Sequence, residues 1–465
     1  MNRIKSVFLP VAMVLLTACG GGGGSGSSQA PVDDNTNNPP EPNAYIWEEA
    51  SPESVGMDSS RISAAFDTAF ADGSYTQAAL VIKDNKLVYE RYRGILPGEV
   101  STMVNSLDAN AATLEENYGA RDRYSLASSW STGKSFTSVL IAIAIEQGHI
   151  ESLQQSASDF IDEWADDERS QISIRNLLDM RSGLALICIN ASTGQLGPCS
   201  EPAGTGGNLV FSDNQMSACI DRQMAQRGVF QSWYGSVYES GYWVYSNCDT
   251  MVLGEILFRA TGQDLQSYAD INLFSKIGMQ AYWWRDFDTS AQVDGNYLAY
   301  CCIDATPRDF AKFGQLLMNN GTWDGAQVVP SDYIDLIKNI VVDSVVAERY
   351  GGTMSYGLKF WTLFPSLQQD GTFYPPANKI YSTIGFDGQY IIMDFDNNLI
   401  VVRNSIYHPS LNLTDERRMK INLGDPENTN HVFTLPAGVG MQTGSNFNVA
   451  SLLYGVTQSI NASSQ

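Results

Sequence analysis

Residues 131–145 of the chain read STGKSFTSVLIAIAI, and this stretch decides the fold prediction. Its apolar part is too broad for the single stripe of a surface helix, so the pattern predicts a helix that is buried on all sides. Ser131 would lie at the N-terminus of that helix, with Lys134 one turn further on the same face. A lysine that has lost its proton through burial can activate a serine hydroxyl, which is otherwise a weak nucleophile. The spacing S-x-x-K therefore indicates a candidate nucleophile and base, with a capped buried helix as the alternative.

Two later motifs carry further candidate site residues. Tyr245 and Asn247 belong to the motif Y-S-N, in which a tyrosine can exchange protons with a leaving group and an asparagine can orient a substrate or a lysine. Gly385 and Phe386 belong to TIGFDGQ at residues 383–389. A glycine there lets a substrate approach an edge strand whose backbone N–H groups stabilise an oxyanion. Taken alone, the first motif also fits an aromatic patch at the core edge, and the second fits a glycine turn into a strand.

The two ends of the folded part show the same pattern. Residues 79–89 and residues 390–402 each contain two apolar runs separated by a turn with Asp and Asn, which predicts a β-hairpin at each end. The apolar spacing predicts helices next to these hairpins, over residues 58–71 and 447–460. We expect residues 131–300 to be mostly helical with glycine-rich loops. The expected fold is therefore α/β (α+β), an antiparallel sheet flanked by helices with an inserted, mostly helical subdomain.

The first 18 residues have the pattern of an export signal. Arg3 and Lys5 precede an apolar run over residues 7–16, which is too short to span a bilayer, and small residues follow it. Because Cys19 stands at the cleavage point, the segment resembles a bacterial lipoprotein signal, in which Cys19 is lipidated and becomes the mature N-terminus. An ordinary signal peptide followed by an unrelated cysteine is the alternative.

The rest of the chain divides into a tether and one large folded unit. Residues 19–44 are rich in Gly, Ser, Asn and Pro, so we expect a flexible linker with a reach of roughly 25–30 Å. Residues 45–465 form the expected catalytic domain, with neither a second long linker nor an internal repeat. Gly20 after Cys19 resembles an outer-membrane sorting signal. The expected location is the bacterial cell envelope, with the lipid in the outer membrane and the domain on its periplasmic or surface side.

The composition excludes several classes of function. The 465 residues are 43% hydrophobic and 17% charged, which is typical of a globular protein rather than a disordered one. With 28 Lys and Arg against 51 Asp and Glu, the formal charge is −23, whereas a nucleic-acid binder needs a basic surface. Anionic lipids would repel the chain as well, so we expect membrane contact only through the N-terminal lipid. With three histidines and neither H-E-x-x-H nor C-x-x-C, we expect no metal and no other cofactor.

Three further segments complete the set of motifs. They read LLDMRSGL at residues 177–184, TPRDFAKFG at 306–314 and GFDGQ at 385–389. Together with S-x-x-K and Y-x-N, they resemble the serine β-lactamase and penicillin-binding-protein superfamily. The nearest resemblance is to its class C-like members, the family VIII carboxylesterases and 6-aminohexanoate-dimer hydrolases. It covers about residues 50–460 and implies a β-lactamase-like sheet domain and helical domain, with the active site between them.

The resemblance also implies a role for each candidate residue. Ser131 matches the acylated nucleophile and Lys134 its general base. Tyr245 matches the tyrosine that exchanges protons with the attacking and leaving groups, and Asn247 matches the third position of that motif. The oxyanion hole of the family consists of two backbone N–H groups, which here would be those of Ser131 and Phe386.

One departure from the family pattern bears on the substrate. Where β-lactamases of this superfamily carry Lys-Thr-Gly and many relatives carry His-x-Gly, this chain has Thr383-Ile384-Gly385. The missing cation removes the partner expected for a penicillin carboxylate, a charge-assisted bond worth about 1.5–3 kcal/mol. Acyl transfer does not depend on that partner.

These observations together predict an exported serine hydrolase of small ester or amide substrates. The aromatic residues from Trp233 to Trp243 predict a pocket wall for extended, partly apolar groups. Two alternatives stay open. One is an enzyme acting on cell-wall peptides or β-lactams, and the other is a non-catalytic binding lipoprotein of the same fold.

Six cysteines follow the lipidation site, an even number that suggests disulfides in an exported chain. Cys188 and Cys199 flank a loop of Gly, Pro and Ser and are the expected local pair. We further hypothesise that Cys248 pairs with Cys301 or Cys302 and fixes the pocket wall.

Overall fold

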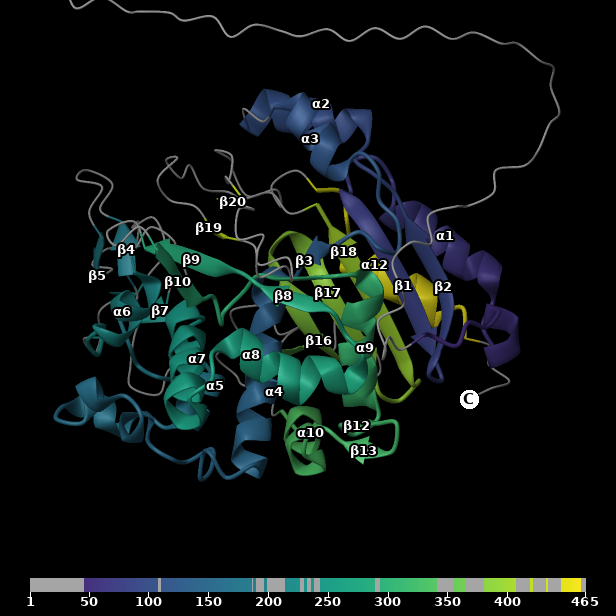
Figure 1. The fold of residues 1–465 in the computed structure, drawn as a ribbon. Coiled ribbons are helices and arrows are strands. Elements are labelled where there is room, and N and C mark those ends of the chain that lie inside the picture. The colour runs from purple at the N-terminus through teal and green to yellow at the C-terminus, as the bar shows by residue number, and fades with distance from the viewer. Residues whose placement is uncertain are drawn as a thin grey trace, which may run out of the picture. The chain divides into compact units, whose positions relative to one another are not determined.

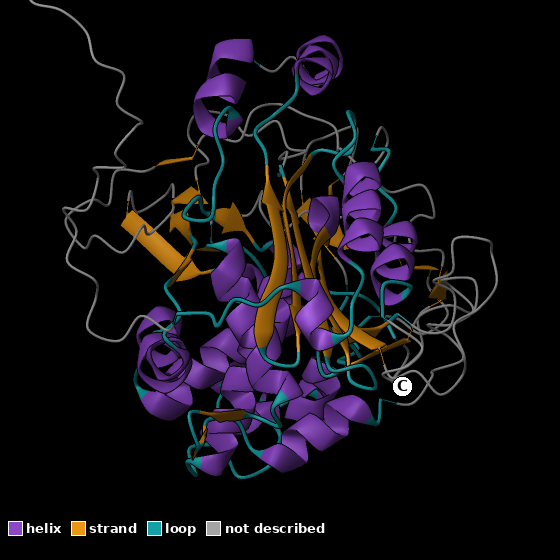
Figure 2. Ribbon diagram, turned by 90° about the vertical axis from the view of Figure 1, so that its right-hand side faces the viewer, coloured by secondary structure: helices purple, strands orange, loops and turns teal. Residues whose placement is uncertain are grey.

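A computed structural model of the chain shows a central sheet with helices on both faces (Figures 1 and 2). It describes residues 46–107, 110–185, 187–189, 196–198, 214–225, 230–231, 236–237, 243–288, 293–340, 355–363, 380–406, 419–420, 432–433 and 445–460. The expected signal peptide, Cys19 and the expected linker lie outside these residues, as does Cys199. None of the helices within these segments combines the length and the apolar character needed to cross a membrane.

The central sheet has seven strands in the order β14-β15-β16-β17-β18-β1-β2. Their bounds are β14 Ser355–Gly357, β15 Phe360–Thr362, β16 Ile380–Gly385, β17 Gln389–Asp394, β18 Leu399–Ser405, β1 Thr76–Lys83 and β2 Lys86–Tyr92. All six neighbouring pairs are antiparallel. Both predicted hairpins are present, and β1 pairs with β18, so the sheet joins the two ends of the folded chain as expected.

The helices and the short strands surround this sheet. The α-helices are α1 Ser59–Ala69, α2 Pro97–Leu107, α3 Ala111–Tyr118, α4 Gly133–Glu146, α5 Ile174–Leu178, α6 Gln215–Ile220, α7 Asn247–Thr261, α8 Leu265–Ala269, α9 Pro307–Met318, α10 Ser331–Lys338 and α12 Val449–Thr457. The short strands are β3 Ala127–Ser128, β4 Ile187–Ile189, β5 Leu196–Pro198, β6 Phe230–Gln231, β7 Ser236–Val237, β8 Ala281–Trp283, β9 Arg285–Asp288, β10 Val293–Tyr297, β11 Ile303–Ala305, β12 Thr322–Trp323, β13 Ala326–Gln327, β19 Met419–Lys420 and β20 Val432–Phe433. Between residues 131 and 300 the described elements are α4 to α8 with short strand pairs and single helical turns.

The two faces of the sheet belong to two separate cores. Because side chains alternate along a strand, Ala79 and Val81 of β1 point to one face, whereas Leu80 and Ile82 point to the other. Helices α1 and α12 cover the first face (Figure 2) and pack closely, since a Cβ at Gly455 would lie 2.5 Å from the Cβ of an α1 alanine. The second face packs against α9 and the helices beyond it.

Helix α4 lies in the second core, as its sequence predicts. Every residue from Gly133 to Ala144 is buried. Phe136 stacks on Phe313 of α9 with ring centroids 3.8 Å apart. Helix α9 begins after Thr306, whose side chain accepts a hydrogen bond from the backbone N–H of Asp309. Because α4 is enclosed by the core, its packing fixes the position of its first turn and of the residues just before it.

The disulfides differ from the hypothesis. Cys248 bonds to Cys219, and Cys301 bonds to Cys302. The hypothesis was wrong because α6 packs against the start of α7, which brings the Cα atoms of Cys219 and Cys248 to 5.1 Å. The predicted pair of Cys188 and Cys199 stays a prediction, because Cys199 falls outside the described residues.

Loss of the bond between α6 and α7 should destabilise the domain. Replacing Cys219 and Cys248 by Ala should lower the free energy of unfolding by about 3 kcal/mol, because the bond closes a loop of 29 positions. Urea unfolding of the wild type and the double variant measures this difference. Peptide mapping without reductant is the control, and Cys248 found linked to Cys301 or Cys302 would contradict the pairing.

Candidate active site

Ser131 lies in a tight turn that is held from one side. The turn is a 3₁₀ segment, Trp130–Thr132, that leads directly into α4. Trp130 has a φ of +46°, a conformation that non-glycine residues rarely adopt. Ser129 exchanges two hydrogen bonds with the backbone of Ile303, both 2.8 Å long, and the N–H of Cys302 donates to the Trp130 carbonyl at 3.1 Å. The neighbouring segment therefore fixes the backbone on which the serine is carried.

Lys134 lies one turn further and reaches back to the serine. Its Nζ is 2.9 Å from Ser131 Oγ and donates to the Tyr300 carbonyl oxygen at 2.8 Å. The lysine is 1% exposed, whereas Ser131 is half-buried. Burial, and after it the positive charge of Lys359, hold the pKa of Lys134 well below its usual range. A neutral amine in this position donates one N–H to the carbonyl and has its lone pair free to take the serine proton.

Tyr245 lies next to the same lysine, and Asn247 follows two residues later in the chain. The Tyr245 ring centroid lies 4.9 Å from Lys134 Nζ, and the Tyr300 ring lies 5.4 Å from it on another side. Asn247 is the first residue of α7 and is half-buried. The backbone before α7 is attached to Met180, because Val244 donates to its carbonyl at 2.9 Å. Tyr245 is therefore positioned by the loop after α5 as well as by α7.

The end of β16 packs against the other side of the turn Trp130–Thr132, which is called the serine turn below. Thr132 Oγ1 lies 3.2 Å from both Thr383 Oγ1 and the Gln389 carbonyl oxygen. A Cβ at Gly385 would lie 2.2 Å from the backbone oxygen of Ser129. The glycine is thus needed for contact with the serine turn, a reason different from the substrate approach that we expected.

Phe386 is placed next to the serine turn by the same packing. Its ring packs edge-on against Trp130, with centroids 5.8 Å apart. We expected an edge strand here, but β16 lies between β15 and β17. Strand β15 pairs only with Tyr381 and Ser382, so the last part of β16 extends beyond it and has the edge character that the chemistry needs.

An aromatic cluster adjoins Tyr245. Trp361 stacks on Tyr245 at 5.8 Å, and Trp243 and Tyr356 pack against both rings. Trp243 is only 1% exposed, so it belongs to the core and does not form the open pocket wall that we expected from the run it ends. The aromatic residues at 233, 234, 238 and 242 fall outside the described residues.

One buried residue near the site was not predicted from the sequence. Lys359 lies in the turn between β14 and β15 and is 2% exposed. Its backbone accepts a 2.7 Å hydrogen bond from Ser135 Oγ of α4. A lysine inside the apolar run YGLKFW was the available signal, since a charged residue in a buried strand pair needs an explanation.

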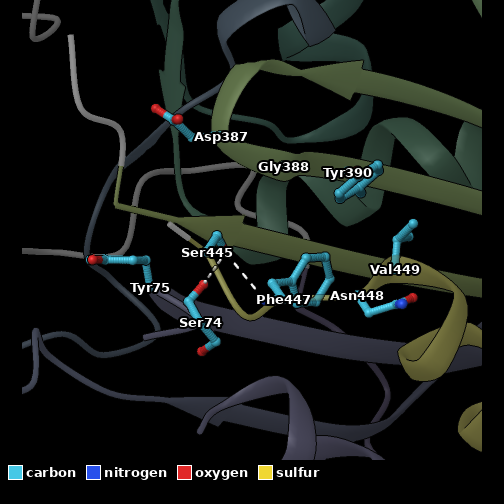
Figure 3. Close-up of a pocket in the computed structure, with 9 residues that line it drawn as sticks. All are labelled: Ser74, Tyr75, Asp387, Gly388, Tyr390, Ser445, Phe447, Asn448 and Val449. Carbon is cyan, nitrogen blue, oxygen red and sulfur yellow. Dashed lines mark hydrogen bonds between the residues drawn. The ribbon is translucent and has the colours of Figure 1, made fainter. Parts of the chain in front are cut away.

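A pocket of about 300 Å³ lies elsewhere (Figure 3). Tyr390 and Phe447, which line it, pack on the core under α1 and α12, on the other face of the sheet from α4. None of the predicted site residues lines this pocket. Within the described segments, no group of three or more His, Cys, Asp or Glu side chains is arranged to hold a metal ion.

Comparison with known proteins identifies the family. The family model for Beta-lactamase matches residues 66–419, which is most of the chain. The chain belongs to the Beta-lactamase family. This is a superfamily of serine hydrolases, so the serine and lysine at the start of α4 lie in the fold of a hydrolase.

Solved structures share the Beta-lactamase fold with this chain. A Bacillus anthracis protein described as a 6-aminohexanoate-dimer hydrolase is 20% identical, with a TM-score of 0.53 over 78% of this chain and 82% of its own. An octameric penicillin-binding-protein homologue from Pyrococcus abyssi is 18% identical, with a TM-score of 0.52 over 75% and 74%. EstCE1, a hydrolase with promiscuous acyltransferase activity, is 15% identical, with a TM-score of 0.52 over 76% and 94%.

Burial of a neutral lysine should be visible in the pH dependence of stability. Between the lowered pKa of Lys134 and the ordinary value of 10.5, the unfolded chain binds a proton that the folded chain does not. Stability therefore rises with pH in this window, by up to about 1.4 kcal/mol per pH unit. Lys134→Met removes this slope, so its stability relative to the wild type should be highest at pH 7 and should decline toward pH 10.

Urea unfolding at pH 7, 8, 9 and 10 measures this difference. Lys312→Met is the matched control, because Lys312 is also buried but forms an ion pair with Asp309 at 2.7 Å. It should lower stability at every pH, since it leaves a buried carboxylate without its partner. A difference between Lys134→Met and the wild type that does not change with pH would contradict the assignment of a neutral amine.

Proposed function

We propose that the chain is an exported serine hydrolase that cleaves small ester or amide substrates through an acyl-enzyme on Ser131. The observation that carries this proposal is the 2.9 Å contact between Ser131 Oγ and the fully buried amine of Lys134. Because the strongest charge acting on Lys134 is another cation, the amine is kept as a base rather than as an ion-pair partner.

The proposed cycle begins with attack of Ser131 Oγ on the substrate carbonyl carbon, while Lys134 takes the hydroxyl proton. The oxyanion that forms is stabilised by the backbone N–H groups of Ser131 and Phe386. Tyr245 gives a proton to the departing alcohol or amine as the ester or amide bond breaks, and it regains one from the protonated Lys134. Water then attacks the acyl-enzyme, releases the acid and restores the serine. Asn247, half-buried at the start of α7, orients the substrate next to Tyr245.

The residues around the site support an uncharged acyl group. Thr383 takes the position where a cation would bind a substrate carboxylate, and the next residue, Ile384, packs against the cluster that contains Trp361 and Tyr245. Two fold neighbours, described as a 6-aminohexanoate-dimer hydrolase and a hydrolase with promiscuous acyltransferase activity, fit amide and ester substrates. Among substrates, these features favour linear esters and amides over β-lactams.

The proposal includes export and anchoring. Residues 1–18 would be removed, Cys19 would carry the lipid, and residues 19–44 would tether the domain to the outer membrane of the cell envelope. Two disulfides in the described residues support an oxidising compartment.

Purified full-length chain should hydrolyse a short p-nitrophenyl ester, and Ser131→Ala should reduce that rate by at least about 10³-fold. The same pair of proteins assayed on a linear aminohexanoate dimer separates the two substrate classes, since amide turnover would place the chain with the amide hydrolases. Equal rates for wild type and Ser131→Ala on both substrates would contradict the proposal. They would favour cell-wall chemistry or binding.

Tyr245→Phe should lower kcat by about 10²-fold or more, because the leaving group loses its proton donor. Tyr356→Phe is the matched control: Tyr356 packs in the same aromatic cluster but has no role in the proposed cycle, so kcat should remain near the wild-type value. Steady-state rates on the ester measure both. A wild-type kcat for Tyr245→Phe would remove Tyr245 from the mechanism.

A further inference from the structure

A second lysine is buried next to the first turn of α4. Lys359 is held at both ends of its backbone, because its N–H donates to the Leu178 carbonyl at 3.1 Å and its carbonyl accepts from Ser135 Oγ at 2.7 Å. Its Nζ donates to Met180 Sδ at 3.2 Å. The same sulfur accepts the backbone N–H of Ser246 at 3.3 Å, so one atom joins Lys359 to the motif that carries Tyr245.

The charges of two carboxylates act on this lysine. Asp249 of α7, which is 1% exposed, acts on Lys359 with its negative charge, and Asp179 after α5 does so as well. Asp249 is fixed by Ser182, whose Oγ donates to its Oδ1 at 2.8 Å. Asp179 is fixed by the N–H of Leu358 at 2.8 Å.

Other charged groups face the outer sides of this cluster. Arg222, buried after α6, acts on Asp249, and Arg175 of α5 pairs with Asp179. On the side of the serine, Tyr245 and Tyr300 present their rings to Lys134. The charge of Lys359 thus acts on Lys134, whereas the carboxylates act on Lys359.

Two buried ammonium groups whose charges act on each other cannot both keep their protons at low cost, because each positive charge disfavours the other. The proton stays where carboxylates stabilise it, which is on Lys359. Burial lowers the pKa of Lys359 to about 7, while Asp249 and Asp179 oppose that effect. For Lys134, by contrast, burial and the charge of Lys359 act in the same direction.

We propose that Lys359 is a positioning residue for the reaction: its ammonium, balanced by Asp249, acts through Lys134 and keeps that amine available as the base. The inference rests on the proposed function of Ser131 and Lys134 and adds the group that sets the pH at which they work. Lys359 does not touch substrate, since it is only 2% exposed.

The test is the pH profile of ester hydrolysis by the full-length chain. Lys359→Met should move the acidic limb of kcat/KM upward by about one pH unit, because Lys134 regains its proton when the neighbouring cation is gone. At pH values below the shifted limb, kcat/KM of the variant should therefore be about tenfold lower than that of the wild type, and it should recover at high pH. Lys359→Arg keeps the charge and should leave the limb in place. A uniform loss at every pH, or an unmoved limb, would show a packing role only and overturn the inference.

A second variant keeps the test open if Lys359→Met does not fold. Asp249→Asn removes the counter-charge, so Lys359 gives up its proton and the acidic limb should again move upward. This direction is diagnostic, because removing a nearby carboxylate ordinarily moves the titration of a base downward. A downward shift would overturn the inference.

A third measurement needs no substrate and separates this inference from the proposed function. In the stability profile with pH, the slope that Lys134→Met removes should begin at a higher pH in the Lys359→Met background than in the wild type. An unchanged onset would overturn the inference even in an active enzyme. A shifted onset in a chain without ester or amide turnover would uphold the coupling of the two lysines and reject the reaction.

Discussion

The contact between Lys134 Nζ and Ser131 Oγ, 2.9 Å long and enclosed by the core, sets the conditions that the surrounding structure meets. An amine keeps its lone pair there only if water is excluded, and α4 meets this condition because all its residues from 133 to 144 are buried. The same burial costs stability, since an ionisable group is desolvated without a partner of opposite charge. The stacking of Phe136 on α9 is one of the contacts that offset this cost.

Close approach of backbones is the second requirement of the site. A Cβ at Gly133 would lie 2.9 Å from the carbonyl carbon of Cys301, and one at Gly385 would collide with Ser129. The serine turn is therefore packed tightly between the end of β16 and residues 301–303. Trp130 keeps its rare backbone conformation because hydrogen bonds on either side of it leave no alternative.

The sequence predicted the parts of this arrangement that depend on local pattern. The hairpins, the enclosed helix α4 and the motifs around Ser131 and Tyr245 follow from periodicity and spacing over a few residues. The partner of Cys248 could not be obtained in this way, because it depends on how α6 packs on α7. The role of Lys359 could not be predicted for a related reason. The carboxylate that acts on it, Asp249, lies on another element, and a lysine in an apolar run does not reveal which carboxylate is its neighbour.

The pairing of β1 with β18 has a consequence for how the chain folds. Arg403 of β18 donates to Thr76 Oγ1 of β1 at 3.1 Å, although the two residues are 327 positions apart. Contacts of such long range form slowly, because the entropy of closing the loop is lost before the contact is gained. Until β18 arrives, the hairpin of β1 and β2 has an open apolar edge that other chains can join. Synthesis must therefore proceed beyond residue 405 before the sheet closes, and a chain stopped earlier holds the serine and both lysines but lacks the strand that joins β1 to β17.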